Sequence, residues 1–269
     1  MKRSIYLLAM ALVLCSARST AQPGSADAAA ARASAPIDLT GYWVSVVTQD
    51  WRWRMVTPAR GDYMKIPMTA QAKEVADAWD PEQDEAAGEQ CKSYGAPALM
   101  SVPGRLHITW QDDDTLKVET DAGMQTRLFY FSEPPNAAGT PRSWQGISIA
   151  QWEPYESDGG GFIPQTLLIP QERRADDELS GDTQGGSLEV VTTNLRPGYL
   201  RKNGVPYSQD TVLIEHWDLF TQSSTEQWLT ITTRIEDPTY LRRPRVIAIP
   251  FRKEAGGANW DPTPCSATW

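Results

Sequence analysis

The chain has 269 residues, of which 41% are hydrophobic, and it carries 25 lysines and arginines against 34 aspartates and glutamates. The net charge of −9 argues against a nucleic-acid partner, because binding to a phosphate backbone needs a basic surface. After the first twenty or so residues no apolar run is long enough to cross a bilayer, so we expect no membrane span.

Residues 1–21 have the pattern of a secretory signal peptide. Lys2 and Arg3 form a short cationic region, residues 5–14 are apolar, and Ala21 ends a group of small residues of the kind that signal peptidase cleaves after. Cleavage removes three of the 25 basic residues and none of the 34 acidic ones, which leaves a net charge near −12. We therefore expect a secreted protein, periplasmic or extracellular.

The mature chain is expected to be one domain. Residues 22–36 are rich in Ala, Ser, Gly and Pro without periodicity, which is typical of a disordered linker. The domain should then cover 37–269, with insertions near 60–98 and 154–186.

The mature chain keeps two cysteines, Cys91 and Cys265. In an oxidising compartment an even pair most simply forms a disulfide, which would tie the C-terminus to the middle of the chain. A metal site made of both cysteines and the two histidines, His107 and His216, is the alternative, but no close ligand spacing favours it. We expect no metal.

Strand signals dominate the domain. Runs rich in β-branched or aromatic residues, bounded by Gly, Pro, Asn or Asp, predict nine strands. They cover residues 42–48, 105–111, 115–120, 125–131, 144–152, 187–193, 212–220, 228–236 and 245–252. The turns at 112–114 and 121–123 are short, so the second to fourth strands should form an antiparallel meander.

One helical segment stands out between the first strand and this meander. Thr69 is a candidate N-cap, good helix formers fill 71–79, and Pro81 prevents simple continuation of the helix. A second helical piece is expected within 82–92.

Nine strands with several hairpin connections predict an all-β protein, either an antiparallel up-and-down barrel or a sandwich, and we favour the barrel because it leaves no exposed edges. The run 38–43, Asp-Leu-Thr-Gly-Tyr-Trp, resembles the Gly-x-Trp motif that opens the first strand of lipocalins and other calycins. That resemblance implies that Trp43 closes one end of a barrel beneath an arginine from the last strand. Arg245 and Arg252 are the candidates for that arginine.

The whole chain also resembles a group of secreted bacterial proteins of unassigned activity. The resemblance rests on two runs, Asp50-Trp51-Arg52-Trp53-Arg54 and the ending Asn259-Trp260-Asp261-Pro262-Thr263-Pro264-Cys265. The resemblance implies that related proteins exist, but it implies no catalytic or binding activity.

Eleven tryptophans are available for core packing or for a ligand pocket. Trp51 and Trp53 would form one aromatic surface if their segment is extended, because residues two apart on a strand face the same side. Trp144 and Trp152 are further candidates for the wall of a ligand pocket.

The histidines are the candidate polar groups, because their charge changes near neutral pH. Alternation on the second strand places Arg105, His107 and Thr109 on one face, which lines the barrel interior or faces solvent. His216 and its neighbour Glu215 must point to opposite faces, so they cannot act as a pair.

Three functions fit these observations. The first is a secreted lipocalin-like protein that binds a small apolar or aromatic ligand in the barrel interior. The second is a cofactor-free lyase, isomerase or hydrolase in which His107 transfers a proton and Arg105 stabilises negative charge. The third is a carbohydrate-binding module that uses exposed tryptophans. No nucleotide-binding fingerprint, phosphate loop or zinc helix is present in the sequence, and we expect no cofactor.

Overall fold

The computed structural model of the chain describes residues 30–134, 139–154, 186–223 and 226–268. The expected signal peptide and residues 155–185 of the second expected insertion lie outside these ranges. Within them, no helix has both the length and the apolar character needed to cross a bilayer.

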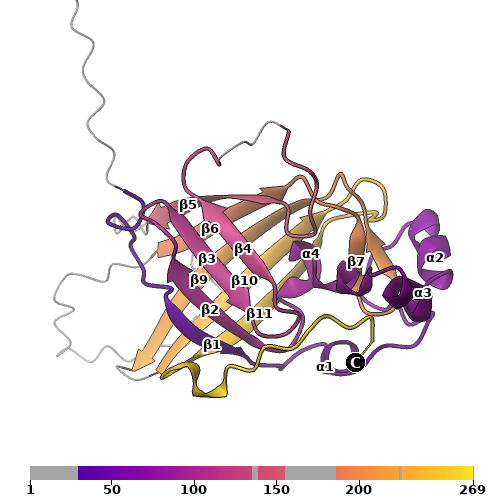
Figure 1. Cartoon of the computed structure of the whole chain (residues 1–269), viewed down its shortest axis with the longest axis horizontal. Coiled ribbons are helices and arrows are strands. Elements are labelled where there is room, and N and C mark those ends of the chain that lie inside the picture. The colour runs from indigo at the N-terminus through magenta and orange to yellow at the C-terminus, as the bar shows by residue number, and fades with distance from the viewer. Residues whose placement is uncertain (1–29, 135–138, 155–185, 224–225, 269) are drawn as a thin grey trace, which may run out of the picture.

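Nine strands close into a barrel whose wall runs in the order β1, β2, β3, β4, β5, β6, β9, β10, β11 and back to β1 (Figure 1). Their bounds are β1 Gly41–Ser45, β2 Arg105–Trp110, β3 Thr115–Thr120, β4 Thr126–Tyr130, β5 Ile147–Pro154, β6 Gly186–Thr193, β9 Val212–Ser223, β10 Glu226–Glu236 and β11 Arg245–Glu254. The predicted all-β barrel of about nine strands is confirmed, and each predicted strand overlaps one of these nine.

The pairing is antiparallel at every step except one. β4 and β5 run parallel over a short register that pairs Phe129 with Ser148 and Tyr130 with Ile149. The barrel therefore departs from a strict up-and-down order, because parallel neighbours cannot be joined by a hairpin.

Alternation along the strands fills the barrel with side chains. On β9, Leu213, Glu215 and Trp217 are fully buried, whereas Ile214 and His216 between them are half-buried on the outside. The main core is shared by all parts of the wall and includes Trp43, Ile108, Leu116, Val118, Phe129, Leu188, Val190, Trp217, Leu229, Ile231, Ile249 and Phe251.

The segment between β1 and β2 carries the helices, which gather at one end of the barrel, on the right in Figure 1. They are α1 Trp51–Arg54, α2 Ala70–Asp77, α3 Pro81–Ala86, the 3-10 helix η1 Gln90–Tyr94 and α4 Ala96–Leu99; a further 3-10 helix, η3 Gly257–Asn259, follows β11. The expected cap is confirmed: the Thr69 hydroxyl accepts a hydrogen bond from the Ala72 amide at 3.2 Å. The second expected helical piece is divided between α3 and η1.

The hairpin of β7 Gly198–Arg201 and β8 Val205–Tyr207 lies under these helices and was not predicted. A second apolar core joins it to α2 and to the barrel end, and it comprises Ile66, Met68, Ala72, Ala76, Ala96, Leu195, Leu200, Val205, Tyr207, Leu213, Ile235 and Leu241. This core holds the helical end against the barrel.

Trp43 of the Gly-x-Trp motif is completely buried, and its indole N–H donates to the Leu39 carbonyl oxygen at 2.9 Å. The cation over its ring is Lys253, whose Nζ lies 4.9 Å from the ring centroid. The prediction that an arginine, Arg245 or Arg252, lies over this ring is therefore wrong. Strand alternation explains it: Lys253 pairs directly with Trp43 in the β1–β11 register, and Arg252 beside it faces outward.

Cys91 in η1 and Cys265 near the end of the chain form the predicted disulfide, with their Cα atoms 5.1 Å apart. The bond ties the C-terminal segment to the helical end of the barrel. Residues 30–36 of the expected linker lie against the other end, where the Trp152 indole donates to the Ala31 carbonyl oxygen at 2.9 Å.

Candidate functional site

Four cations meet in one pocket between the barrel end and the helical segment. We call the group of Arg54, Arg201, Lys202 and Arg245, which lines this pocket together with Asp50, the basic pocket. All four cationic residues are buried, with exposed fractions of 4%, 7%, 4% and 8% respectively. Buried arginines and lysines normally have a charged partner, so four of them around one carboxylate need an explanation.

Different elements deliver these side chains. Arg54 ends α1, Arg201 ends β7, Lys202 is the first residue of the turn before β8, and Arg245 begins β11. Asp50 precedes α1 in a left-handed conformation with φ of 57°, which an aspartate tolerates better than most residues, and its side chain makes no capping hydrogen bond.

Arg54 and Arg245 have unused donors. The Arg54 Nε donates to the Ser101 carbonyl oxygen at 2.8 Å, but its two terminal nitrogens have no hydrogen-bond partner among the described residues. One terminal nitrogen of Arg245 is equally unpartnered in the described part of the chain. Leaving a buried charged donor unsatisfied costs more than leaving a neutral one, so these nitrogens favour a negatively charged ligand.

The other two cationic side chains donate hydrogen bonds to neutral oxygen atoms. Arg201 donates to the carbonyl oxygens of Asp62 and Met64 at 3.3 and 3.2 Å, and its guanidinium lies 4.9 Å from the Trp53 ring centroid. The Lys202 ammonium donates to the Tyr94 hydroxyl at 2.6 Å. Carbonyl oxygens carry no net charge, so the two hydrogen bonds of Arg201 leave its guanidinium cationic.

Burial shifts the titration of all four groups in the direction that disfavours charge. It lowers the pKa of Arg54 to about 10, and the nearby Asp50 opposes the shift. The pKa of Arg201 also falls to about 10, first through burial and then through repulsion from Arg245. The pKa of Arg245 is lowered by burial as well, and that of Lys202 falls to about 8. With pKa values of about 10, 10 and 8, Arg54, Arg201 and Lys202 remain mainly protonated at neutral pH and give the pocket a net positive charge.

The single carboxylate of the pocket is already engaged, because Asp50 forms an ion pair with Lys65 at 2.5 Å. The open space measures about 30 Å³, far less than the several hundred cubic ångströms of a pocket for a drug-sized ligand. Its apolar wall consists of Trp53, Ala98, Val102, Leu200 and Ile247. The space suits a small ion or the charged group of a larger molecule.

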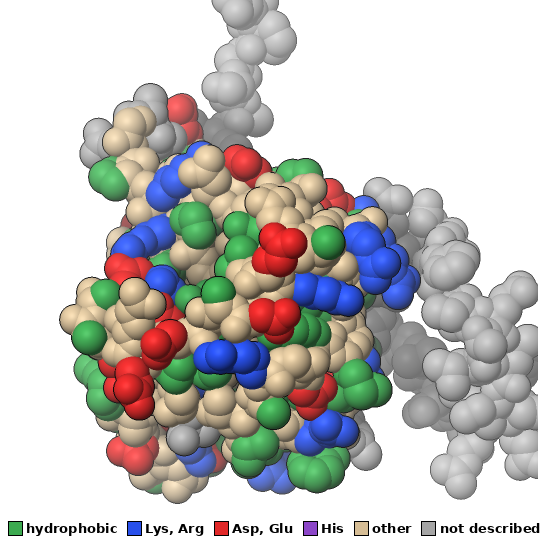
Figure 2. Space-filling view, turned by 90° about the vertical axis from the view of Figure 1, so that its right-hand side faces the viewer, with side chains coloured by type: hydrophobic (Ala, Val, Ile, Leu, Met, Phe, Trp, Pro, Cys, Tyr) green, Lys and Arg blue, Asp and Glu red, His purple; other side chains and the backbone are tan. Residues whose placement is uncertain are grey.

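The outer surface at this end gives no sign of such a concentration of positive charge. Acidic, basic and apolar side chains are interspersed over the face that looks outward from the helical end (Figure 2). The positive charge of the basic pocket is therefore a feature of the interior and not the continuation of a basic surface.

The polar face of β2 points away from the barrel interior. His107 stacks on Tyr42 with ring centroids 4.2 Å apart, and its Nδ1 lies 3.4 Å from a Glu119 oxygen. Arg105 beside it pairs with Glu254 at 2.8 Å, and Thr109 is half-buried on the same outer face. None of the three lines the basic pocket.

The candidate tryptophans lie in separate places. Residues 51–54 form α1 and not an extended segment, so Trp51 and Trp53 point in different directions, roughly 200° apart around the helix. Trp51 is 65% exposed, whereas Trp53 is buried against the basic pocket. The expectation of one aromatic surface is wrong, because an extended segment is needed for it.

Trp144 and Trp152 belong to different ends of the barrel. Trp144 lies under the Arg196 guanidinium near the helical end, at 4.5 Å from the ring centroid. Trp152 packs against Phe131 and Trp110 at the end that residues 30–36 cover, with centroid distances of 5.2 and 6.4 Å. His216 is on the outer wall and Glu215 is inside it, as their alternation predicted.

The fold and the pocket together define the class of this protein: a closed, mostly antiparallel nine-stranded barrel with a helical end that encloses buried cations. Comparisons with protein-family models, with curated proteins and with solved structures found no match to the chain.

Proposed function

We propose that this chain is a secreted, lipocalin-like binding protein whose ligand is a small oxyanion, or a small molecule with a carboxylate or phosphate group, held in the basic pocket. The observation that carries the proposal is that terminal nitrogens of Arg54 and Arg245 find no hydrogen-bond partner among the described residues, although both arginines are more than nine-tenths buried. An anion would satisfy these donors and offset the repulsion between the cations.

Planar guanidinium groups favour this ligand class. Each offers two donors in a fixed geometry that matches two oxygens of a carboxylate or phosphate. The ammonium of Lys202 adds a point charge, and Trp53 and Leu200 form part of the apolar wall. Electrostatic attraction between charges is stronger at such a buried site than at the surface.

The proposed ligand differs from the small apolar or aromatic molecule expected from the sequence, and its site lies at the barrel end instead of in the barrel interior. The inward side chains of the strands fill the main core, whereas the basic pocket is lined by strong donors. Any apolar part of the ligand would contact the pocket wall at Trp53 or Ile247. Secretion is supported by the signal-peptide pattern and by the Cys91–Cys265 disulfide, since such bonds persist mainly outside the cytoplasm.

Isothermal titration calorimetry with phosphate, sulfate and acetate at pH 7 and low ionic strength tests the proposal directly. We expect the wild-type protein to bind at least one of these anions with a stoichiometry of one. Arg54→Met should weaken that binding by about tenfold or more, because a charge-assisted hydrogen bond contributes about 1.5–3 kcal/mol. Arg245→Met provides a second variant in case the first does not fold.

Arg252→Met is the matched control, because Arg252 is exposed on the outer face of the same strand that carries Arg245. Its affinity for the anion should equal that of the wild type. Binding that is absent in the wild type, or unchanged in a folded Arg54→Met protein, would overturn the proposal. Native mass spectrometry of protein purified from the producing cells would identify a retained anion by its mass.

A further inference from the structure

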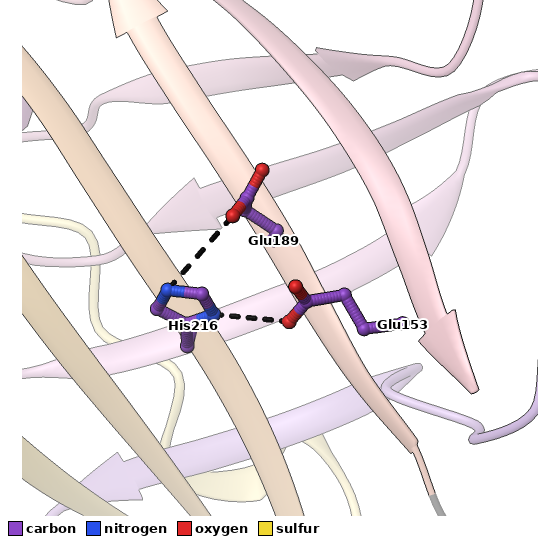
Figure 3. A group of neighbouring side chains, drawn as sticks. All are labelled: Glu153, Glu189 and His216. Atoms are coloured by element: carbon purple, nitrogen blue, oxygen red, sulfur yellow. Dashed lines mark hydrogen bonds and ion pairs between the residues drawn. The ribbon is translucent and has the colours of Figure 1, made fainter. Parts of the chain in front are cut away.

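Three neighbouring strands of the barrel wall bring a histidine and two glutamates together on the outer surface (Figure 3), and none of the three residues lines the basic pocket. Glu153 lies on β5, Glu189 on β6 and His216 on β9. The strand register accounts for their meeting: Glu189 pairs directly with His216, and Glu153 pairs with Ser187, two residues away on the same face.

The imidazole of His216 lies between the two carboxylates. Its Nδ1 is 3.1 Å from an oxygen of Glu153, and its Nε2 is 4.0 Å from an oxygen of Glu189. One ligand atom from each of the three residues can be chosen so that all lie within 4.8 Å of one another. Ligands around a tetrahedral zinc ion with bonds near 2.0–2.1 Å are about 3.4 Å apart, so modest side-chain rotation would complete a coordination sphere.

The surroundings favour a cation here. The three side chains are 34–43% exposed, so solvent and ions reach them. Within the described residues, the only ion-pair partner of either glutamate is His216, which cannot neutralise two carboxylates by itself. A divalent ion would neutralise both carboxylates at once and would be held on three paired strands of a closed barrel.

We propose that Glu153, Glu189 and His216 form a binding site for a divalent transition-metal ion, with zinc as the best-fitting candidate. One imidazole nitrogen and two carboxylate oxygens suit zinc, whereas calcium and magnesium prefer oxygen ligands alone. Three protein ligands leave at least one coordination position open for water or for another small ligand. The site lies outside the proposed anion pocket, and neither proposal depends on the other.

The other histidine of the chain provides a matched control. His107 also lies on the outer wall beside a glutamate, with its Nδ1 3.4 Å from Glu119. That glutamate is shared with Lys117 at 2.9 Å, and no second carboxylate completes a set of three ligands there in the described part of the chain. His107→Ala therefore removes a histidine of similar setting without touching the proposed site.

Titration of the metal-free full chain with Zn²⁺ by calorimetry, and with Co²⁺ by its visible absorption, tests the proposal. We expect one Zn²⁺ per chain in the wild type and in His107→Ala. Loss of a residue that only orients a metal ligand already costs about 10–100-fold in metal affinity. His216→Ala should cost at least as much, and Glu189→Gln should also weaken binding.

All three side chains are partly exposed, so the variants should keep the wild-type circular dichroism spectrum. Three results would each overturn the proposal: a wild type that binds no Zn²⁺ at millimolar concentration, a His216→Ala variant with wild-type affinity, or a His107→Ala variant that loses the ion equally. Binding of Zn²⁺ by the wild type and His107→Ala, with loss in His216→Ala, would support it.

Discussion

Arg127 and Glu215 face each other inside the barrel and form two hydrogen bonds, from one terminal nitrogen to one oxygen at 3.0 Å and from the other to the second oxygen at 2.5 Å. Both side chains are completely buried. The hydroxyl of Thr192 accepts a further bond from Arg127 at 3.0 Å. This arginine is thus neutralised by a matched carboxylate, in contrast to Arg54 of the basic pocket.

Breaking this ion pair should destabilise the barrel. Glu215→Gln leaves Arg127 buried without a counter-charge, and we expect the free energy of unfolding to fall by about 3–5 kcal/mol in urea denaturation. Replacing both partners with apolar residues, as in Arg127→Met with Glu215→Leu, should recover most of the loss because no unpaired charge remains.

Glu236→Gln is the control for that measurement, because Glu236 pairs with Arg234 on the exposed outer face of β10. A surface pair contributes about 0–1 kcal/mol, so its removal should change stability little. Equal losses of unfolding free energy in Glu215→Gln and Glu236→Gln would show that the buried ion pair contributes no more to stability than the exposed one.

The disulfide should stabilise the protein and its helical end in particular. Cys91 and Cys265 are 174 residues apart in sequence, so their bond restricts a long loop of the unfolded chain. The double variant Cys91→Ser with Cys265→Ser should lose about 2–5 kcal/mol of unfolding free energy. A reducing agent should lower the stability of the wild type to the same value and leave the variant unchanged; a reductant effect on the variant would contradict this assignment.

Replacing Arg54 should not lower the free energy of unfolding, in contrast to the two preceding changes. The terminal nitrogens of Arg54 have no hydrogen-bond partner in the described ranges, so the desolvation of this buried charge is poorly compensated there in the ligand-free protein. Arg54→Met keeps the volume and removes the charge, so the unfolding free energy without anion should stay the same or rise by about 1–2 kcal/mol. A large loss of stability in anion-free buffer would show that Arg54 supports the fold and not a ligand.

The barrel could be predicted from the sequence because the patterns that indicate strands and turns are local in the chain. Alternation within each run shows which side chains share a face, and the short turns at 112–114 and 121–123 force antiparallel neighbours. β7 and β8 were missed because they are only four and three residues long and include Pro206, which disfavours a strand assignment. The parallel step between β4 and β5 depends on the long connection between them, which carries no periodic pattern.

The basic pocket could not be predicted from the sequence in this way. Arg54, Arg201 and Arg245 are far apart in the chain, and no spacing rule connects a helix end, a hairpin and the start of the last strand. One signal was available for the interior: Glu215 alternates with Leu213 and Trp217 on an apolar face, which indicates an inward charge that needs a partner. Its partner Arg127 shares a strand face with the apolar Phe129, which likewise indicates a charged side chain that points inward.

Lys202 makes the proposed anion binding dependent on pH. Burial lowers the pKa of its ammonium from the ordinary value near 10.5 to about 8. Between these two values the unfolded chain binds more protons than the folded chain, so this group makes the folded state more stable as pH rises from about 8 to 10.5. Anion affinity changes in the opposite direction, because the ligand needs the protonated lysine.

The affinity for phosphate or acetate should therefore fall as pH rises through 8. With a pKa of about 8, the protonated fraction of Lys202 drops by about tenfold between pH 7 and pH 9, and affinity should fall by up to that factor. Arg54 and Arg201 stay charged over this range because their pKa values are about 10. Calorimetry with acetate, whose own charge is constant there, should show the decline in the wild type and in a Lys73→Met control, because Lys73 is exposed on α2 and does not line the basic pocket. A Lys202→Met protein with the same decline would assign the pH dependence to another group.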